Sequence, residues 1–130
     1  MPDWSIKIIA VKTPKPDLMA QFLPDLSDAN PDNPKPLTVQ QGDLVSWNNT
    51  TGDEHWPWLV TAQNAPPADP PPQPGGYLTT SIVKPHDSSD AYYVDVPAGT
   101  TLYYCCKCHP AERASIVVVP FGLPTDKPTS

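Results

Sequence analysis

Long apolar runs and clusters of basic residues are both missing from this chain of 130 residues. Because no stretch of about 18 consecutive apolar residues occurs, the sequence predicts no membrane span. Lysine and arginine number 8 against 14 aspartates and glutamates, which gives a net charge of −6. Nucleic acids and anionic membranes bind clustered positive charge, so this balance argues against both as partners. An acidic protein of this kind is suited to a partner with a basic face.

Cysteine, histidine and methionine are scarce, at 3, 3 and 2 residues. An odd number of cysteines argues against a framework made only of disulfides. The G-x-S-x-G, Gly-rich phosphate-loop and H-E-x-x-H motifs are absent, so we expect a protein that is not an enzyme. The opening MPDWSIKIIAVK lacks the charged-then-apolar form of a secretory signal, which leaves a cytoplasmic protein or a mature form as expectations.

Proline, in contrast, is abundant, at 20 of 130 residues. It breaks helices and central strands, whereas the short runs between the prolines are rich in β-branched and aromatic residues. These runs predict strands at 5–12, within 37–49 and 91–106 (two each, around turns), and at 114–120, with a short edge strand at 81–85 and one helical turn at 17–23. The pattern predicts an all-β fold, a β-sandwich with long Pro-rich loops.

The length of the chain is that of one domain, so we expect a single domain over residues 1–130. Within it, 64–76 (NAPPADPPPQPGG) is a low-complexity insert of polyproline character, and 121–130 is expected to be a loose tail. The run at 114–120 is continuously apolar, which is typical of a strand buried on both faces.

All three cysteines and one of the three histidines lie in the segment CCKCH, residues 105–109. Thiolate and imidazole together suit zinc, copper, or iron in a cluster or haem. Neighbouring side chains on a strand point to opposite faces, so one extended segment cannot turn all four inward. The other ligands must come from elsewhere, and His55 in WNNTTGDEHWPW is the candidate. Two histidines and a cysteine with a weak axial ligand form the blue-copper arrangement.

Two segments carry a family resemblance. VPAGTTLYYCCKCHPAERASIVVV, residues 96–119, resembles the C-terminal signature of cupredoxins, the plastocyanin-like copper proteins. In that signature a cysteine, two residues, His-Pro, one residue and a methionine precede a final apolar strand. GDLVSWNNTTGDEH, residues 42–55, resembles their first-ligand segment. The resemblance implies a cupredoxin-like Greek-key β-sandwich with one copper ion held by His55, Cys106 and His109. It also implies a small electron carrier that serves a redox partner protein and is periplasmic or extracellular.

The sequence departs from that signature in two places. Glu112 stands where the family has methionine, three residues after His109. A carboxylate is harder than a thioether, so an axial Glu112 is expected to lower the reduction potential and alter the colour. A backbone carbonyl near Asp53 is the other axial candidate. The C-x-x-H-P spacing favours Cys106 as the thiolate, but counting forward from the Gly-Thr turn at 99–100 selects Cys105.

The same residues permit other hypotheses. Residues 105–109 also match C-x-x-C-H, the c-type haem motif, in which Cys105 and Cys108 form thioethers and His109 binds the iron. That alternative needs a large apolar slot. A second alternative is a copper storage or chaperone module that holds Cu(I) with two or three thiols. A thiol enzyme using Cys106 and His109 is a further hypothesis, for which no orienting partner can be assigned.

Overall fold

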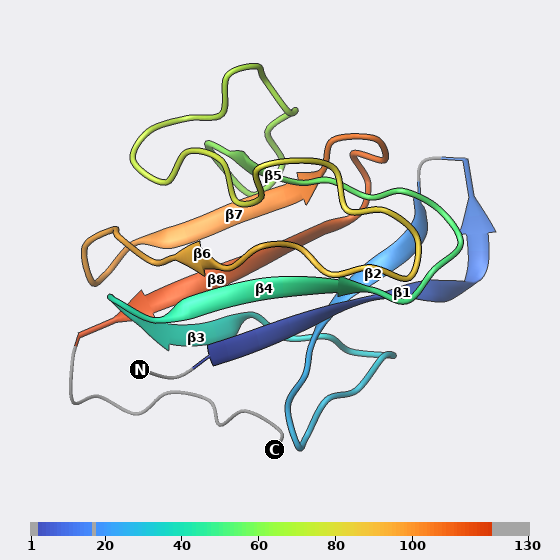
Figure 1. Cartoon of the computed structure of the whole chain (residues 1–130), viewed down its shortest axis with the longest axis horizontal. Coiled ribbons are helices and arrows are strands. Elements are labelled where there is room, and N and C mark those ends of the chain that lie inside the picture. The colour runs from blue at the N-terminus through green and yellow to red at the C-terminus, as the bar shows by residue number, and fades with distance from the viewer. Residues whose placement is uncertain (1–2, 17, 121–130) are drawn as a thin grey trace.

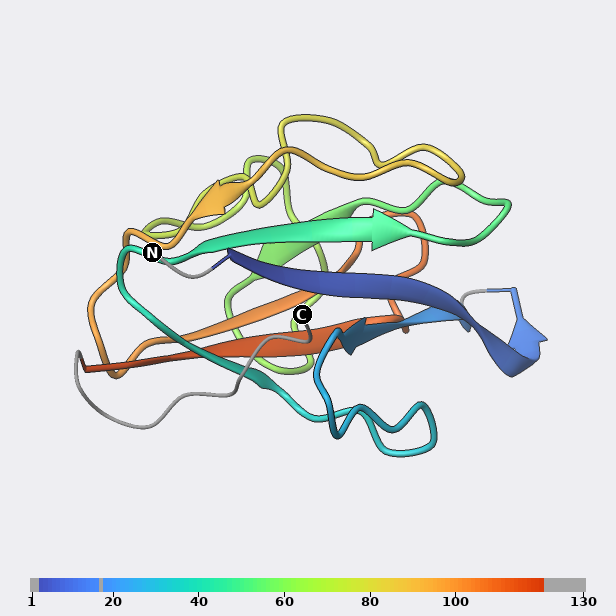
Figure 2. The ribbon, with the colours of Figure 1, turned by 60° about the horizontal axis from the view of Figure 1, so that its bottom comes forward.

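Two four-stranded sheets face each other in the computed structural model, which describes residues 3–16 and 18–120. The strands are β1 (Asp3–Lys15), β2 (Leu18–Pro24), β3 (Leu37–Gln40), β4 (Leu44–Asn49), β5 (Pro57–Val60), β6 (Tyr92–Tyr93), β7 (Thr101–Cys106) and β8 (Arg113–Val119). One sheet has the order β2-β1-β4-β6 and the other β3-β8-β7-β5 (Figures 1 and 2). No helix occurs in the described ranges, and hence none there that could cross a membrane. The predicted all-β sandwich is therefore confirmed.

Strand pairing brings residues from distant parts of the chain to one end of the sandwich. β1 pairs with β4 and β3 pairs with β8 in parallel, while β7 lies antiparallel to both β5 and β8. Because β5 and β7 are antiparallel, the first residue of β5, Pro57, lies opposite the last residue of β7, Cys106. β8 begins beside that same end, with Arg113 opposite Cys105. The loop before β5 and the loop between β7 and β8 therefore meet there.

The core follows from the two-residue alternation of side chains along each strand. Along β7, Leu102, Tyr104 and Cys106 all belong to the buried core cluster. Trp47 of β4 donates a hydrogen bond from Nε1 to the Tyr104 hydroxyl at 3.3 Å, and Phe22 of β2 packs edge-on against the same ring. Cys106 is thus the last core-facing residue of β7, and the core-facing residue before it, Tyr104, is held by aromatic contacts.

The helical turn expected at 17–23 is wrong, because Leu18–Pro24 form strand β2. Asp17 itself lies outside the described residues. β2 pairs with β1 in a regular register, for example Ile8 with Phe22 and Ala10 with Ala20. Ala20 and Phe22 are buried, so cross-strand pairing and burial override the weak local helix preference of this segment.

Two further expectations, on the burial of the last strand and on an edge strand, are wrong. The run at 114–120 is buried on one face only, since Ile116 and Val118 are buried while Val117 and Val119 are half-buried. The edge strand expected at 81–85 is reduced to an isolated bridge between Val83 and His55. The tail at 121–130 lies outside the described residues.

The Pro-rich segment 64–76 packs against β5 and the strands beside it (Figure 1). Trp58 donates a hydrogen bond from Nε1 to the carbonyl of Ala68 at 2.7 Å, and the Tyr92 hydroxyl donates to the carbonyl of Gly75 at 3.1 Å. Gly75 has φ +118°, and a Cβ there would overlap Leu59 Cδ2. The backbone approach therefore requires glycine at this position.

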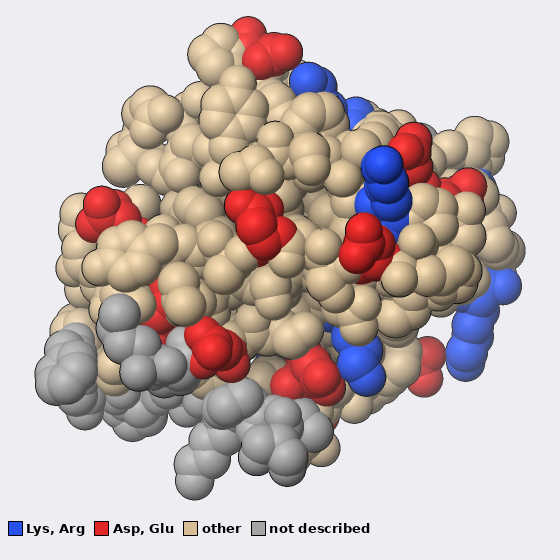
Figure 3. All heavy atoms as spheres, viewed as in Figure 1, with Lys and Arg blue, Asp and Glu red and all other residues tan. Residues whose placement is uncertain are grey.

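Charge is distributed unevenly over the face shown in Figure 3. Acidic side chains are spread across that face, whereas lysine and arginine side chains lie mainly in its right-hand half. This arrangement agrees with the net charge of −6 of the whole chain.

Candidate metal centre

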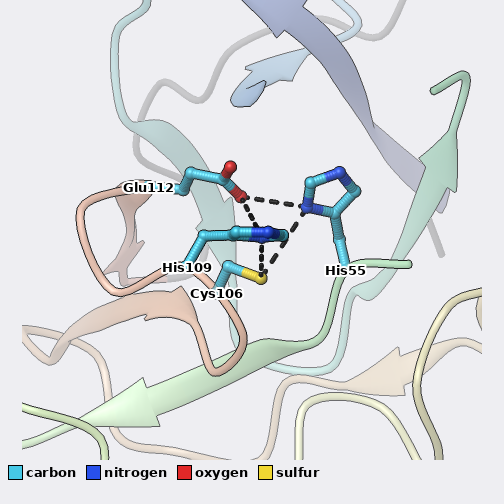
Figure 4. Close-up of side chains that lie close together, drawn as sticks. All are labelled: His55, Cys106, His109 and Glu112. Atoms are coloured by element: carbon cyan, nitrogen blue, oxygen red, sulfur yellow. Dashed lines mark hydrogen bonds and ion pairs between the residues drawn. The ribbon is translucent and has the colours of Figure 1, made fainter. Parts of the chain in front are cut away.

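Four side chains converge at the end of the sandwich where β7 ends. His55, Cys106, His109 and Glu112 each offer one donor atom, and these atoms lie within 4.8 Å of one another (Figure 4). Cys106 Sγ is 3.7 Å from His55 Nδ1 and 3.6 Å from His109 Nδ1. Glu112 Oε1 is 2.9 Å from His55 Nδ1 and 3.6 Å from His109 Nδ1. The structure thus brings together the four residues named from the sequence as the copper set.

The two sulfur–nitrogen separations in this cluster fit a bound metal ion, whereas the 2.9 Å between Glu112 Oε1 and His55 Nδ1 is a hydrogen-bond distance. Zinc, for example, binds thiolate sulfur at about 2.3 Å and imidazole nitrogen at about 2.0 Å. At angles between tetrahedral and trigonal, such bonds hold sulfur and nitrogen about 3.5 to 3.7 Å apart. The two sulfur–nitrogen separations, 3.6 and 3.7 Å, agree with that range. A thiolate with two imidazoles is a donor set suited to copper.

Local turns place three of the four residues on one side of the β7–β8 loop. The backbone N–H of His109 donates to the carbonyl of Cys106 at 3.2 Å, and that of Glu112 donates to the carbonyl of His109 at 2.9 Å. The N–H of Cys106 in turn donates to the carbonyl of Glu112 at 2.8 Å, which closes the loop. Two successive four-residue turns therefore direct positions 106, 109 and 112 toward the same point.

His55 lies in the loop between β4 and β5, two residues before β5, and is held there by its backbone. Its N–H donates to the carbonyl of Val83 at 3.1 Å, and the N–H of Val83 donates back at 2.8 Å. The next residue, Trp56, donates its backbone N–H to Cys106 Sγ at 3.4 Å. This contact joins the two ligand segments, and an N–H donor stabilises negative charge on the sulfur.

The Glu112 carboxylate is held by the main chain of β2. Oε2 accepts hydrogen bonds from the N–H groups of Met19 and Ala20, each at 2.8 Å, which leaves Oε1 facing the cluster. Burial raises the pKa of Glu112, but the hydrogen bond and charge of His55, together with the two amides, outweigh burial and lower it overall. The side chain is 1% exposed, so a fixed, ionised carboxylate lies beside the imidazoles.

His55 is fully buried and its ring is held at both nitrogens. Nδ1 faces Cys106 and Glu112, while Nε2 lies 3.1 Å from the hydroxyl of Thr51. Burial lowers the pKa of His55, but hydrogen bonds to Cys106 and Glu112 and the charges of both groups raise it to about 9. In the metal-free protein at neutral pH, a proton on Nδ1 therefore bridges His55 and Glu112. His109 is the most accessible of the four residues, with 18% of its side chain exposed.

The other two cysteines lie outside this cluster. Cys105 is the register partner of Trp58 and, as the neighbour of inward-facing Cys106, points to the opposite face of the sheet. It is fully buried, whereas Cys108 is exposed in the loop, and burial raises the pKa of both thiols. The structure therefore does not bring Cys105, the alternative thiolate, to the cluster.

The haem alternative gains no support from this arrangement. It needs Cys105 and Cys108 to bind one macrocycle, but Cys105 is a fully buried residue of β7 while Cys108 is exposed to solvent. The backbone carbonyl of Asp53, the other axial candidate, accepts a hydrogen bond from Asn49 Nδ2 at 2.7 Å and lies 3.1 Å from the Thr51 hydroxyl oxygen. That carbonyl is thus engaged by the loop that precedes His55.

Sequence reasoning missed the groups that support the cluster. The amides of Met19 and Ala20 are main-chain donors, and main-chain donors cannot be recognised from the residue types in a sequence. Asn49 and Thr51 lie six and four residues before His55, a spacing that by itself predicts no contact with its ring.

Comparisons with known proteins identify the fold. No protein-family model matches the chain, and no curated protein matches it. A solved structure named as a novel purple cupredoxin from Nitrosopumilus maritimus superposes with a TM-score of 0.58 at 14% identity, covering 88% of this chain and 97% of that one. Amicyanin from Paracoccus versutus superposes with a TM-score of 0.50 at 14% identity, covering 88% and 80%. The chain therefore has the cupredoxin fold, as its two ligand-segment motifs predict.

Proposed function

We propose that this protein is a small electron carrier whose redox centre is one copper ion bound by His55, Cys106, His109 and Glu112. The observation that carries the proposal is the buried convergence of two imidazole nitrogens, a thiol and a carboxylate within 4.8 Å, on a cupredoxin fold. Copper in such a site supplies a one-electron change between its two common oxidation states. We further propose that residues 1–130 act as one domain and that the protein is not an enzyme.

The surrounding residues suit a rigid redox site. Cys106 lies at the end of a fully paired strand and accepts the N–H of Trp56. Glu112 is fixed by two amides of β2, and His55 by its bridge to Val83. Because strands from both sheets hold these groups, their positions change little with charge, which lowers the barrier to electron transfer. His109, whose side chain is 18% exposed, is the proposed exit for the electron.

The Glu112 carboxylate distinguishes this site from the methionine-containing signature. An anionic oxygen stabilises the more highly charged oxidised metal, so we propose a lower reduction potential and a different colour from a methionine-ligated site. The two β2 amides withdraw part of the carboxylate's charge and limit this effect.

The proposed partner is a redox protein with a basic docking face. The net charge of −6 and the acidic side chains spread across the face in Figure 3 support this choice. We also propose a periplasmic or extracellular location, which rests on the resemblance to cupredoxins.

An absorption spectrum of the purified, copper-loaded protein tests the proposal. We expect intense visible bands that disappear on reduction with ascorbate, that Cys106→Ser abolishes, and that Cys105→Ser retains. Loss of the bands only in Cys105→Ser would show that the thiolate is assigned to the wrong cysteine. A sharp Soret band would indicate haem instead. A colourless protein that binds Cu(I) through its thiols would indicate storage or delivery of copper.

A further inference from the structure

A chain of hydrogen bonds in the loop before His55 ends on the side of its ring that faces away from the cluster. Nδ1 of His55 faces Cys106 and Glu112, and Nε2 lies 3.1 Å from Thr51 Oγ1. In the neutral imidazole that binds a metal, the atom of the Thr51–His55 pair that donates decides which ring nitrogen keeps a free lone pair. The neighbours of Thr51 settle that direction.

The first link is the side-chain amide of Asn49, which is fully buried at the end of β4. Its Nδ2 lies 2.7 Å from the carbonyl oxygen of Asp53 and 3.2 Å from those of Val83 and Lys84. Carbonyl oxygens only accept hydrogen bonds, so the amide must turn its NH₂ group toward them. The Oδ1 atom of Asn49 is thereby directed to the other side.

The second link is Thr51. Asn49 Oδ1 accepts the backbone N–H of Thr51 at 2.9 Å and lies 2.7 Å from its hydroxyl oxygen. Because Oδ1 carries no hydrogen, the hydroxyl is the donor, and its single hydrogen is used there. The carbonyl of Asp53, 3.1 Å from the same hydroxyl, is also only an acceptor. In its hydrogen bond with His55, Thr51 Oγ1 can therefore only accept.

The third link follows from the first two. Since Thr51 Oγ1 can only accept, Nε2 of His55 must carry the hydrogen that it shares at 3.1 Å. We propose that Asn49 and Thr51 are positioning residues, which hold the His55 proton on Nε2 and so present the Nδ1 lone pair to the metal. This inference rests on the proposed metal centre. Outer groups of this kind orient ligand imidazoles, and their loss costs about 10- to 100-fold in metal affinity.

The test compares variants that alter only the acceptor. Thr51→Val has the shape of threonine without the hydroxyl, while Thr51→Ser restores the hydroxyl. Thr50→Val is the matched control, because the exposed Thr50 donates its hydroxyl to the carbonyl of Ile8 at 2.8 Å and does not touch His55. Zn²⁺ is the probe, since it is diamagnetic and binds the same donor types.

Two measurements are made on each protein. Competition with a chromophoric chelator is expected to show Zn²⁺ binding about 10- to 100-fold weaker in Thr51→Val, with Thr51→Ser and Thr50→Val close to wild type. Nuclear magnetic resonance of the Zn²⁺ form is expected to show the His55 Nε2–H signal in wild type and Thr51→Ser. In Thr51→Val that signal is expected to be broadened by exchange with water.

An unchanged affinity with a retained Nε2–H signal in Thr51→Val would overturn the inference. Should that variant not fold in urea titrations, Thr51→Ala is used, and the same pair of results decides. The outcome is separable from the proposed function. A wild-type protein that binds neither copper nor Zn²⁺ at His55 refutes the metal centre. Normal copper bands in wild type, together with unchanged Zn²⁺ affinity and an unchanged Nε2–H signal in Thr51→Val, refute only the positioning role.

Discussion

Raising the pH from 6 to 9 is expected to destabilise the metal-free protein through one residue, His55. Burial alone lowers the pKa of this histidine, but the hydrogen bonds and charges of Cys106 and Glu112 outweigh burial and raise the pKa from 6.5 to about 9. Below pH 6.5 the imidazole is protonated in both the folded and the unfolded chain, so its stabilising effect is complete. Between the two pKa values only the folded chain holds the proton, and that effect is lost as the pH rises through 9.

The size of the change follows from the difference of the two pKa values. Each pKa unit corresponds to about 1.4 kcal/mol, so the shift to about 9 contributes about 3 kcal/mol to the free energy of unfolding below pH 6.5. His55 and Glu112 are both fully buried as side chains, so solvent screening does not reduce this value. In a domain of this length, such a loss lowers the melting temperature by roughly 10 °C.

Urea titrations of the metal-free, reduced protein at half-unit steps of pH measure this loss. Glu112→Gln is the informative variant, because its amide oxygen can still accept the Met19 and Ala20 N–H groups while the negative charge beside His55 is removed. Its stability is expected to depend much less on pH. His86→Asn is the control, since His86 is exposed and asparagine tolerates its positive φ of 57°.

A wild-type stability that stays constant between pH 6 and 9 would refute the assigned proton bridge. So would a Glu112→Gln variant with the same pH slope as wild type, since the slope would then arise elsewhere.

Three further predictions follow from single features of the structure. Gly75→Ala is expected to lower the free energy of unfolding by about 1 to 3 kcal/mol in urea titrations, because φ is +118° and the added Cβ overlaps Leu59; no loss would contradict the close packing. Iodoacetamide is expected to modify exposed Cys108 in the folded, metal-free protein while fully buried Cys105 reacts only on unfolding, and mass spectrometry of peptides distinguishes the two; early labelling of Cys105 would be the contrary result. Glu112→Met is expected to raise the midpoint potential of the copper protein in a redox titration, since a neutral thioether replaces an anion; a lower potential would exclude Glu112 as a ligand.

The Pro-rich segment 64–76 has a structural role that the sequence did not reveal. The segment accepts the Nε1–H hydrogen bond of Trp58. The rings of Trp56 and Tyr77 pack edge-on against the Trp58 ring, at centroid distances of 5.1 and 5.4 Å. The ammonium group of Lys107 lies 4.0 Å from the Trp58 ring centroid and 3.4 Å from Asp69 Oδ2. These contacts join the segment to the β7–β8 loop, which carries His109 and Glu112 of the candidate metal centre.

Patterns that are local in the chain were sufficient to predict much of the fold and three of the four residues of the candidate site. Two-residue alternation and proline spacing predict the strands around residues 5–12, 37–49, 91–106 and 114–120, because a strand with one exposed and one buried face alternates polar and apolar residue types. The C-x-x-H-P spacing brings Cys106 and His109 together, since a four-residue turn needs only a local backbone hydrogen bond. Glu112, another three residues along, follows from the same turns.

The remaining features depend on partners that are distant in sequence and often have no residue type. His55 reaches Cys106 only through the pairing of β5 with β7, and Leu18–Pro24 is a strand only because β1 supplies its hydrogen bonds. The amides that hold Glu112 belong to the main chain of β2, so the side chains in the sequence do not predict them. By itself, then, the sequence determined which donors are available and their local order. Tertiary structure alone decided their supports and which thiol faces inward, because register and main-chain hydrogen bonds arise between segments rather than within one.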